Sequence, residues 1–185
     1  MPASVLYMSM SLDGYIAGPN DEPGNPGGDE FMRLHDWYGF GPDGPDRKSV
    51  PVPKSELGQV FLDEINATGA VLAGRRTVEQ VDHWQGDHHG VPVFVPSHRP
   101  PGPSVANYPL VTYVADGIAG AMAQAKAAAR DQNVLVHGAY TAQTALASKP
   151  GCWTSCRYTR FRCCSAAAVD YSMCCRRVSS WRLFE

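Results

Sequence analysis

Apolar positions along the first 148 residues follow two spacings, and each spacing predicts one kind of element. Short apolar runs bounded by turn residues predict strands over 5–12, 69–73, 91–95, 110–114 and 134–136. Apolar residues that recur every three or four positions predict helices over 55–66, 76–81, 118–130 and 141–147. Strands that alternate with helices are typical of an α/β fold with a mainly parallel sheet.

The pattern also predicts a cap for one helix and a buried side for another. Ser55 is expected to cap the helix over 55–66. Its apolar residues Leu57, Val60, Phe61 and Ile65 recur at helical spacing. In the Ala-rich helix over 118–130 the expected buried residues are Ile118, Met122, Ala125 and Ala129.

Composition restricts the classes of protein that fit. A hydrophobic content of 44% with 18% charged residues is typical of a folded domain rather than a disordered chain. The net charge of -2 gives no reason to expect nucleic acid or an anionic membrane as a partner. No apolar run approaches the roughly 20 residues that span a bilayer, and residues 1–5 do not resemble a signal peptide. We therefore expect a cytoplasmic protein.

Glycine, hydroxyl and cationic residues follow three of the predicted strands. These turns are Gly74-Arg75-Arg76-Thr77, Ser97-His98-Arg99 and His137-Gly138-Ala139-Tyr140-Thr141. Because the carboxyl ends of parallel strands share one edge of a sheet, the three turns are expected to lie together. Glycines, arginines and a helix start suit phosphate groups, so the turns can form a dinucleotide cradle. The alternative is three ordinary polar turns with solvated arginines.

Other residues suggest chemistry less specifically. Asp13, after the first strand, can orient a substrate or relay a proton, although Asp-Gly is also an ordinary turn. Tyr15 and Trp37 can stack on a flat heterocycle or belong to the core. Three histidines, at 83, 88 and 89, offer a metal site as an alternative, but their spacing matches no common pair of helical ligands, so no metal is expected.

Taken in order, these segments resemble the dihydrofolate-reductase-like family, which includes the reductase domain of bacterial riboflavin biosynthesis. The resemblance covers about residues 3–148, and the expected domain is residues 1–148. It rests on Ser-Leu-Asp-Gly-Tyr-Ile-Ala-Gly at 11–18, the Phe31–Trp37 segment, Gly-Arg-Arg-Thr at 74–77, Pro92–Val95 with Ser-His-Arg at 97–99, and Gly-Ala-x-Thr-Ala-Gln at 138–143.

The resemblance implies a three-layer α/β/α sandwich with NADPH along the carboxyl edge of the sheet. Its hydride would reduce a small pterin-like or ribosylaminopyrimidine substrate. Residues 74–77 and 97–99 would bind cofactor phosphates, residues 138–141 would hold the pyrophosphate, and Asp13 would lie near the substrate. His137 stands where the family usually has glycine, so it would either crowd the pyrophosphate or donate a hydrogen bond to it. Relatives often form homodimers.

Residues 149–185 depart from that family. All six cysteines lie after Gly151. Cys and Trp codons both begin with the bases TG. If the reading frame shifts by one base near residue 150, every shifted triplet that takes its last two bases from such a codon ends in TG, and it therefore encodes Leu, Val or Met. The shifted frame permits Gly-Val-Leu-Asp-Glu-Leu-Gln-Val-His-Gln-Ile-Pro-Val-Leu-Leu-Gly-Gly-Gly-Arg-Arg-Leu-Phe-Asp-Val-Leu-Pro, the tail that the family resemblance implies.

We therefore interpret 149–185 as an aberrant, out-of-frame tail on an incomplete domain. A zinc site, a disulfide framework and a basic nucleic-acid-binding tail are the alternatives, and the tail has neither a Cys-x-x-Cys pair nor a secretion signal to support the first two. The chain as written is then expected to be unstable, and its alternative function is that of an inactive remnant with at most residual nucleotide binding.

Overall fold

The computed structural model describes residues 3–11, 15–38, 56–147 and 156–162. The chain divides into two compact units. The first unit contains residues 1–7 and 63–159, and the second contains residues 8–62 and 160–185. The three polar turns all belong to the first unit.

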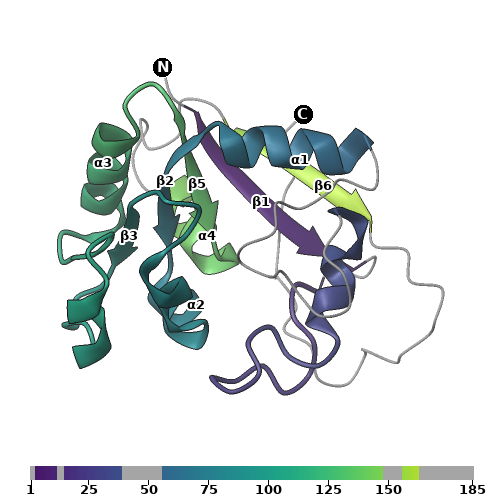
Figure 1. The fold of residues 1–185 in the computed structure, drawn as a ribbon, viewed down its shortest axis with the longest axis horizontal. Helices are drawn as coiled ribbons and strands as arrows, with labels where there is room; N and C mark the ends of the chain where they lie inside the picture. The colour runs from purple at the N-terminus through teal and green to yellow at the C-terminus, as the bar shows by residue number, and fades with distance from the viewer. Residues whose placement is uncertain (1–2, 12–14, 39–55, 148–155, 163–185) are drawn as a thin grey trace. The chain divides into compact units, whose positions relative to one another are not determined.

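The sheet has the strand order β4-β3-β2-β5-β1-β6 (Figure 1). Its strands are β1 (Ser4–Met10), β2 (Thr68–Ala73), β3 (Val93–Pro96), β4 (Val111–Val114), β5 (Asn133–His137) and β6 (Cys156–Arg162). The pairs β1 with β5, β5 with β2, β2 with β3, and β3 with β4 are all parallel. The α/β fold with a mainly parallel sheet that the sequence predicts is confirmed.

The connections between these strands are helical. The α-helices are α1 (Glu56–Asn66), α2 (Arg75–Gln80), α3 (Gly117–Ala129) and α4 (Ala139–Ala147). Shorter 3-10 segments are η1 (Phe31–Tyr38), η2 (Asp82–Gly86) and η3 (Pro103–Asn107). Helix α3 packs on β2 and β3 and also contacts α4. Among the described helices, none combines the length and the apolar character needed to cross a membrane.

The core of the first unit lies where β2 and β5 meet α3. Every residue of β2 is buried, which explains why its sequence is a continuous apolar run rather than an alternating one. Ala121, Ala125 and Ala129 of α3 are at most 2% exposed. Small alanine side chains let the helix approach the sheet closely, and Met122 fills the remaining space at 1% exposure.

The predicted buried side of α3 needs one correction. Ile118 is only partly buried, and Ala121 is fully buried instead, because a wide apolar stripe includes adjacent positions such as 121 and 122. In α1, Val60 is 49% exposed and Leu62 is buried. The predicted cap Ser55 lies outside the described residues.

Candidate functional site at the carboxyl edge of the sheet

The three polar turns lie at one edge of the sheet. Strands β3, β2 and β5 are adjacent and parallel, and the turns follow their carboxyl ends. Ala73 and His137 are partners in the register, so Gly74 and Gly138 are the next residue on each strand. The Gly74 N–H donates to the His137 carbonyl oxygen at 3.4 Å. The expected gathering of the turns is therefore observed, while what they bind stays a prediction.

Two glycines and two threonine hydroxyls converge between β2 and β5. A Cβ atom on Gly74 would lie 2.5 Å from Thr141 Oγ1, which is closer than any real contact allows. A Cβ atom on Gly138 would lie 3.1 Å from Thr77 Oγ1, and Gly138 also has a φ of +92° that disfavours other residues. We call Gly74, Thr77, Gly138 and Thr141 the glycine–threonine cluster. Space disfavours a side chain at Gly74, and backbone conformation disfavours one at Gly138.

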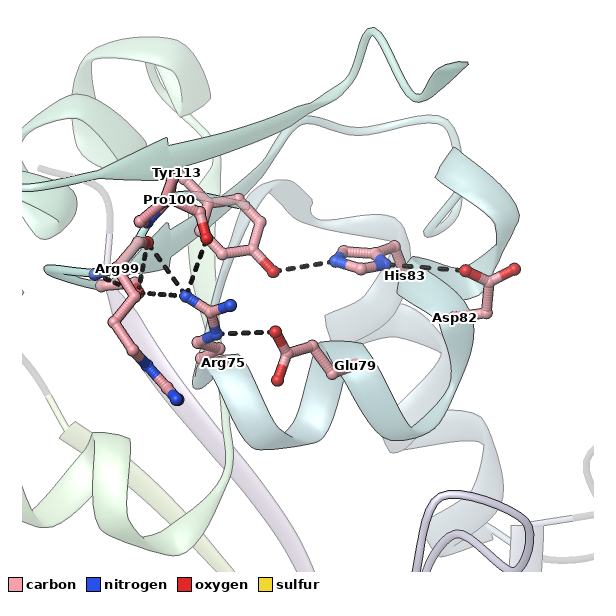
Figure 2. Close-up of polar contacts among 8 residues, drawn as sticks. Arg75, Glu79, Asp82, His83, Arg99, Pro100 and Tyr113 are labelled. Carbon is pink, nitrogen blue, oxygen red and sulfur yellow. Dashed lines mark hydrogen bonds and ion pairs between the residues drawn. The ribbon is translucent and has the colours of Figure 1, made fainter. Parts of the chain in front are cut away.

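The Arg75 guanidinium joins the start of α2 to the turn after β3 (Figure 2). Its Nε donates to Glu79 Oε1 at 2.6 Å, within an ion pair. Its Nη1 donates to Ser97 Oγ at 3.0 Å and to the carbonyl oxygens of Arg99 and Pro100 at 2.9 and 3.1 Å. These contacts use Nε and Nη1, so Nη2 is the nitrogen of Arg75 that can serve a ligand.

The Ser97 hydroxyl also makes hydrogen bonds within its own turn. Its hydroxyl donates to the Arg99 carbonyl oxygen at 2.9 Å and accepts from the Arg99 N–H at 3.2 Å. A serine hydroxyl has a single proton to donate. Ser97 thus shapes the turn, and the exposed side chains of His98 and Arg99 are the groups of this turn best able to reach a phosphate.

A second polar chain starts at the Tyr113 ring, which lies 5.5 Å below the Arg75 guanidinium. The Tyr113 hydroxyl is 2.9 Å from His83 Nε2. Burial, with the Glu79 carboxylate, raises the pKa of Tyr113, and Arg75 opposes this effect. Tyr113 therefore keeps its proton at neutral pH and is not an activated nucleophile. His83 Nδ1 is 3.8 Å from Asp82 Oδ1, too far for a hydrogen bond (Figure 2).

The backbone of η2 turns in the left-handed sense. Asp82, His83, Trp84 and Gln85 have φ values of 43°, 54°, 51° and 53°. This conformation costs non-glycine residues about 1–2 kcal/mol each. The sequence pattern predicts no element here. Contacts with residues distant in the sequence hold the turn instead, since His83 meets Tyr113 of β4 and the Tyr108 hydroxyl donates to Asp82 Oδ2 at 2.8 Å.

Two histidines that are far apart in the sequence meet beside the glycine–threonine cluster. His88 Nε2 lies 3.1 Å from Nε2 of His137, the last residue of β5. The indole of Trp84 contacts His88 edge-on, with 4.4 Å between ring centroids. Within the described part of the chain, no three His, Cys, Asp or Glu residues are grouped to bind a metal ion. His83 and His88 have different partners, Tyr113 and His137.

We expect the stability of the fold to depend on pH because His88 is buried. Burial, with contributions from His137 and His89, lowers the pKa of His88 well below its ordinary value. The unfolded chain takes up this proton near pH 6.5 and the folded chain does not. The contribution of His88 to the free energy of unfolding is thus fully present above about pH 6.5. As the pH decreases below 6.5, the free energy of unfolding decreases by at most about 1.4 kcal/mol per pH unit. Urea unfolding at pH 5.5 and 7.5 checks this, and a His88→Phe variant should lose that part of the difference.

The remaining predicted site residues are less informative. Asp13, the expected catalytic residue, lies outside the described residues. Tyr15 belongs to the second unit, where its N–H donates to Ser11 Oγ at 2.9 Å. Trp37 lies in η1, also in the second unit, and only its backbone is described. Tyr140 is 81% exposed in the first turn of α4, and Arg76 is exposed on α2.

Sequence reasoning missed two features of this site. It considered His88 only as a metal ligand, and it did not connect His88 with His137, which is 49 positions away. It also treated Arg75 and Ser97 as independent phosphate ligands, although they bind each other. Neither pairing has a local signal, since each one depends on which strands become neighbours in the sheet.

Comparison with known proteins supports the fold. No protein-family model matches the chain, and no curated protein matches it. Among solved structures, the chain is similar to a "putative riboflavin biosynthesis protein" from Shewanella sp. PV-4. The identity is 22% and the TM-score is 0.51, over 78% of this chain and 69% of the other. At this identity the likeness concerns the fold alone, and that fold is the dihydrofolate-reductase-like α/β fold.

Proposed function

We propose that this chain derives from an NADPH-dependent reductase that acts on a pterin-like or ribosylaminopyrimidine substrate. The observation that carries the proposal is the set of three turns at the carboxyl ends of β3, β2 and β5. Ligands of open parallel sheets bind at this edge. The riboflavin-related name of the structural neighbour agrees with a substrate of this class.

The residues at this edge fit a dinucleotide in three respects. The glycines of the glycine–threonine cluster keep side chains away from the start of α4. The hydroxyls of Thr77 and Thr141 are donors suited to a pyrophosphate. Cationic groups gather on the β3 side, where Arg75 Nη2 and the exposed side chains of His98 and Arg99 are suited to a 2′-phosphate.

Each group has a distinct task in this proposal. The cofactor, when bound, supplies the hydride. The amide groups at the start of α4 and the two threonine hydroxyls bind and orient the pyrophosphate. Arg75 holds the turn at residues 97–100 in one conformation through its three oxygen acceptors, so that Arg99 meets the ligand at little cost in entropy.

Binding of NADPH, followed by its fluorescence, tests the proposal. Arg99→Ala should weaken NADPH binding about tenfold to a hundredfold, because a charge-assisted hydrogen bond contributes about 1.5–3 kcal/mol. NADH lacks the 2′-phosphate, so its affinity should stay the same. Arg130→Ala removes an exposed arginine after α3 and is the matched control. Absence of NADPH binding, or an equal loss for NADH, would count against the proposed cofactor site.

We further propose that residues 149–185 are read out of frame. The support is in the sequence, since the shifted frame permits Leu-Gln-Val-His-Gln-Ile-Pro over the triplets that overlap β6 (Cys156–Arg162). That run is less charged than the present one, which has arginines at 157, 160 and 162. If the tail is out of frame, the second candidate function applies, that of an inactive remnant with residual nucleotide binding. Sequencing the coding DNA around residues 145–155 tests the frame directly.

A further inference from the structure

The contact between His88 and His137 restricts where their protons can lie. At 3.1 Å between the two Nε2 atoms, one proton fits between the rings. Two N–H groups facing each other would repel, and two bare nitrogens would form no hydrogen bond. Each allowed state of this histidine pair therefore has one proton in the gap, and any other proton must lie on an Nδ1 atom.

The surroundings of His88 select among these states. His88 is 6% exposed, and its Nδ1 atom is buried with no hydrogen-bond partner among the described residues. The carbonyl oxygen of His88 accepts from the Val91 N–H at 3.3 Å. A buried N–H without a partner is rarer and more costly than a buried acceptor without one. The Nδ1 atom of His88 is therefore bare.

One protonation state remains. A neutral pair has two protons, one in the gap and one on Nδ1 of either ring. With Nδ1 of His88 bare, His88 carries its proton on Nε2 and donates it to Nε2 of His137. His137 then carries its own proton on Nδ1. A positively charged pair would have three protons and would need one on Nδ1 of His88, which the burial of that atom disfavours.

We propose that His88 is a positioning residue that keeps His137 neutral and in the Nδ1–H tautomer at the end of β5. His137 immediately precedes Gly138 of the glycine–threonine cluster. The pair therefore controls both the charge and the hydrogen-bonding pattern at the place where the proposed cofactor site receives the pyrophosphate. Only the part of this proposal that concerns NADPH rests on the proposed function.

The neighbouring rings and charges are consistent with a neutral pair. Trp84 covers His88 edge-on, and its ring centroid is 5.6 Å from that of His137. The lowered pKa of His88 has the same direction, since burial and the neighbouring histidines disfavour a cation there by more than the backbone of His88 favours one. The other titratable or charged groups on the surrounding elements are Asp82, His83, Asp87 and His89 on η2 and the loop after it, and Arg75, Arg76 and Glu79 on α2.

Nitrogen-15 NMR of the full-length chain tests the protonation state directly. His137 is expected to show a protonated Nδ1 and an unprotonated Nε2 from pH 8 to about 5.5, without titrating. In His88→Phe, which keeps a ring in the buried position, His137 should titrate near pH 6.5, the ordinary value. His89→Phe is the matched control, because His89 contacts His88 but has no bond to His137, and it should leave His137 unchanged.

The proposal is overturned if His137 of the unmodified chain titrates near pH 6.5 or carries its proton on Nε2. It is also overturned if His88→Phe leaves the His137 signals as they were. NADPH affinity gives a second readout. Between pH 7.5 and 5.5, His88→Phe should gain several-fold more affinity than the unmodified chain, because His137 becomes a cation near phosphate. A fixed His137 tautomer without any NADPH binding would refute the proposed function and leave the role of His88 intact.

Discussion

Replacing residues 151–185 by the shifted-frame sequence is expected to raise the free energy of unfolding by about 5 kcal/mol or more. The shifted frame supplies Val, Leu and Ile in place of arginines and cysteines. Each such side chain that becomes buried contributes about 1.5–3 kcal/mol, so three of them approach the whole stability of a small domain, roughly 5–15 kcal/mol. The chain as written should aggregate or melt without cooperativity. Thermal and urea unfolding of both proteins measure the difference.

The control for this experiment is a tail with the same residues as the shifted frame in shuffled order. It has equal hydrophobic content, so any gain specific to the correct order reflects packing rather than composition. A cooperative melt of the chain as written, stabilised further by NADPH, would contradict the expectation. The frame-restored protein keeps residues 1–150, so it also serves for each binding and titration measurement above.

Gly74→Ala is expected to have the second-largest effect, because it places a Cβ atom 2.5 Å from Thr141 Oγ1. Overpacking of this kind costs about 1–3 kcal/mol. The Thr141 hydroxyl or the start of α4 must move to relieve the contact, and both are in the proposed cofactor site, so NADPH binding should weaken at least tenfold, measured by fluorescence titration. Gly102→Ala is the matched control, since Gly102 has open space around it and its φ of -67° suits any residue.

A second substitution tests whether the contact with Thr141 causes the loss. In Gly74→Ala with Thr141→Ala, the clashing hydroxyl is gone, and the new Cβ atom lies 3.9 Å from the Cβ atom of residue 141, an ordinary contact. Stability should recover most of the loss, which gives a coupling free energy of about 0.5–3 kcal/mol. Additive effects in the double variant would show that Gly74 is required for another reason.

The comparison of sequence and structure is clearest at the strand ends. Each predicted strand of the first unit was found within a few residues of its expected place, because apolar runs and turn residues are local signals. The same pattern placed Gly74, Ser97 and Gly138 after strands that are parallel. Parallel strands present their carboxyl ends at one edge, so the gathering of these turns could be predicted without knowing any long-range contact.

Helix interiors were harder to predict. Ile118 was expected to be buried and is only partly so, while Ala121 was not selected and is fully buried. Periodicity identifies an apolar side of a helix, but the neighbouring elements decide which edge of that side is covered. The left-handed turn over 82–85 was missed for a related reason. A run of four non-glycine residues with positive φ is rare, and this one persists because His83 and Asp82 bind Tyr113 and Tyr108.

The amino-acid sequence by itself therefore determined the α/β fold and the edge of the sheet where glycines, hydroxyls and cations collect, and it is the source of the hypothesis that the tail is out of frame. Only the tertiary structure decided that Arg75 binds Ser97, that Gly74 faces Thr141, and that His88 meets His137. The physical reason is the range of the interactions involved. Strands and turns follow from neighbouring residues, whereas a proton shared by two histidines 49 positions apart depends on how the whole sheet assembles.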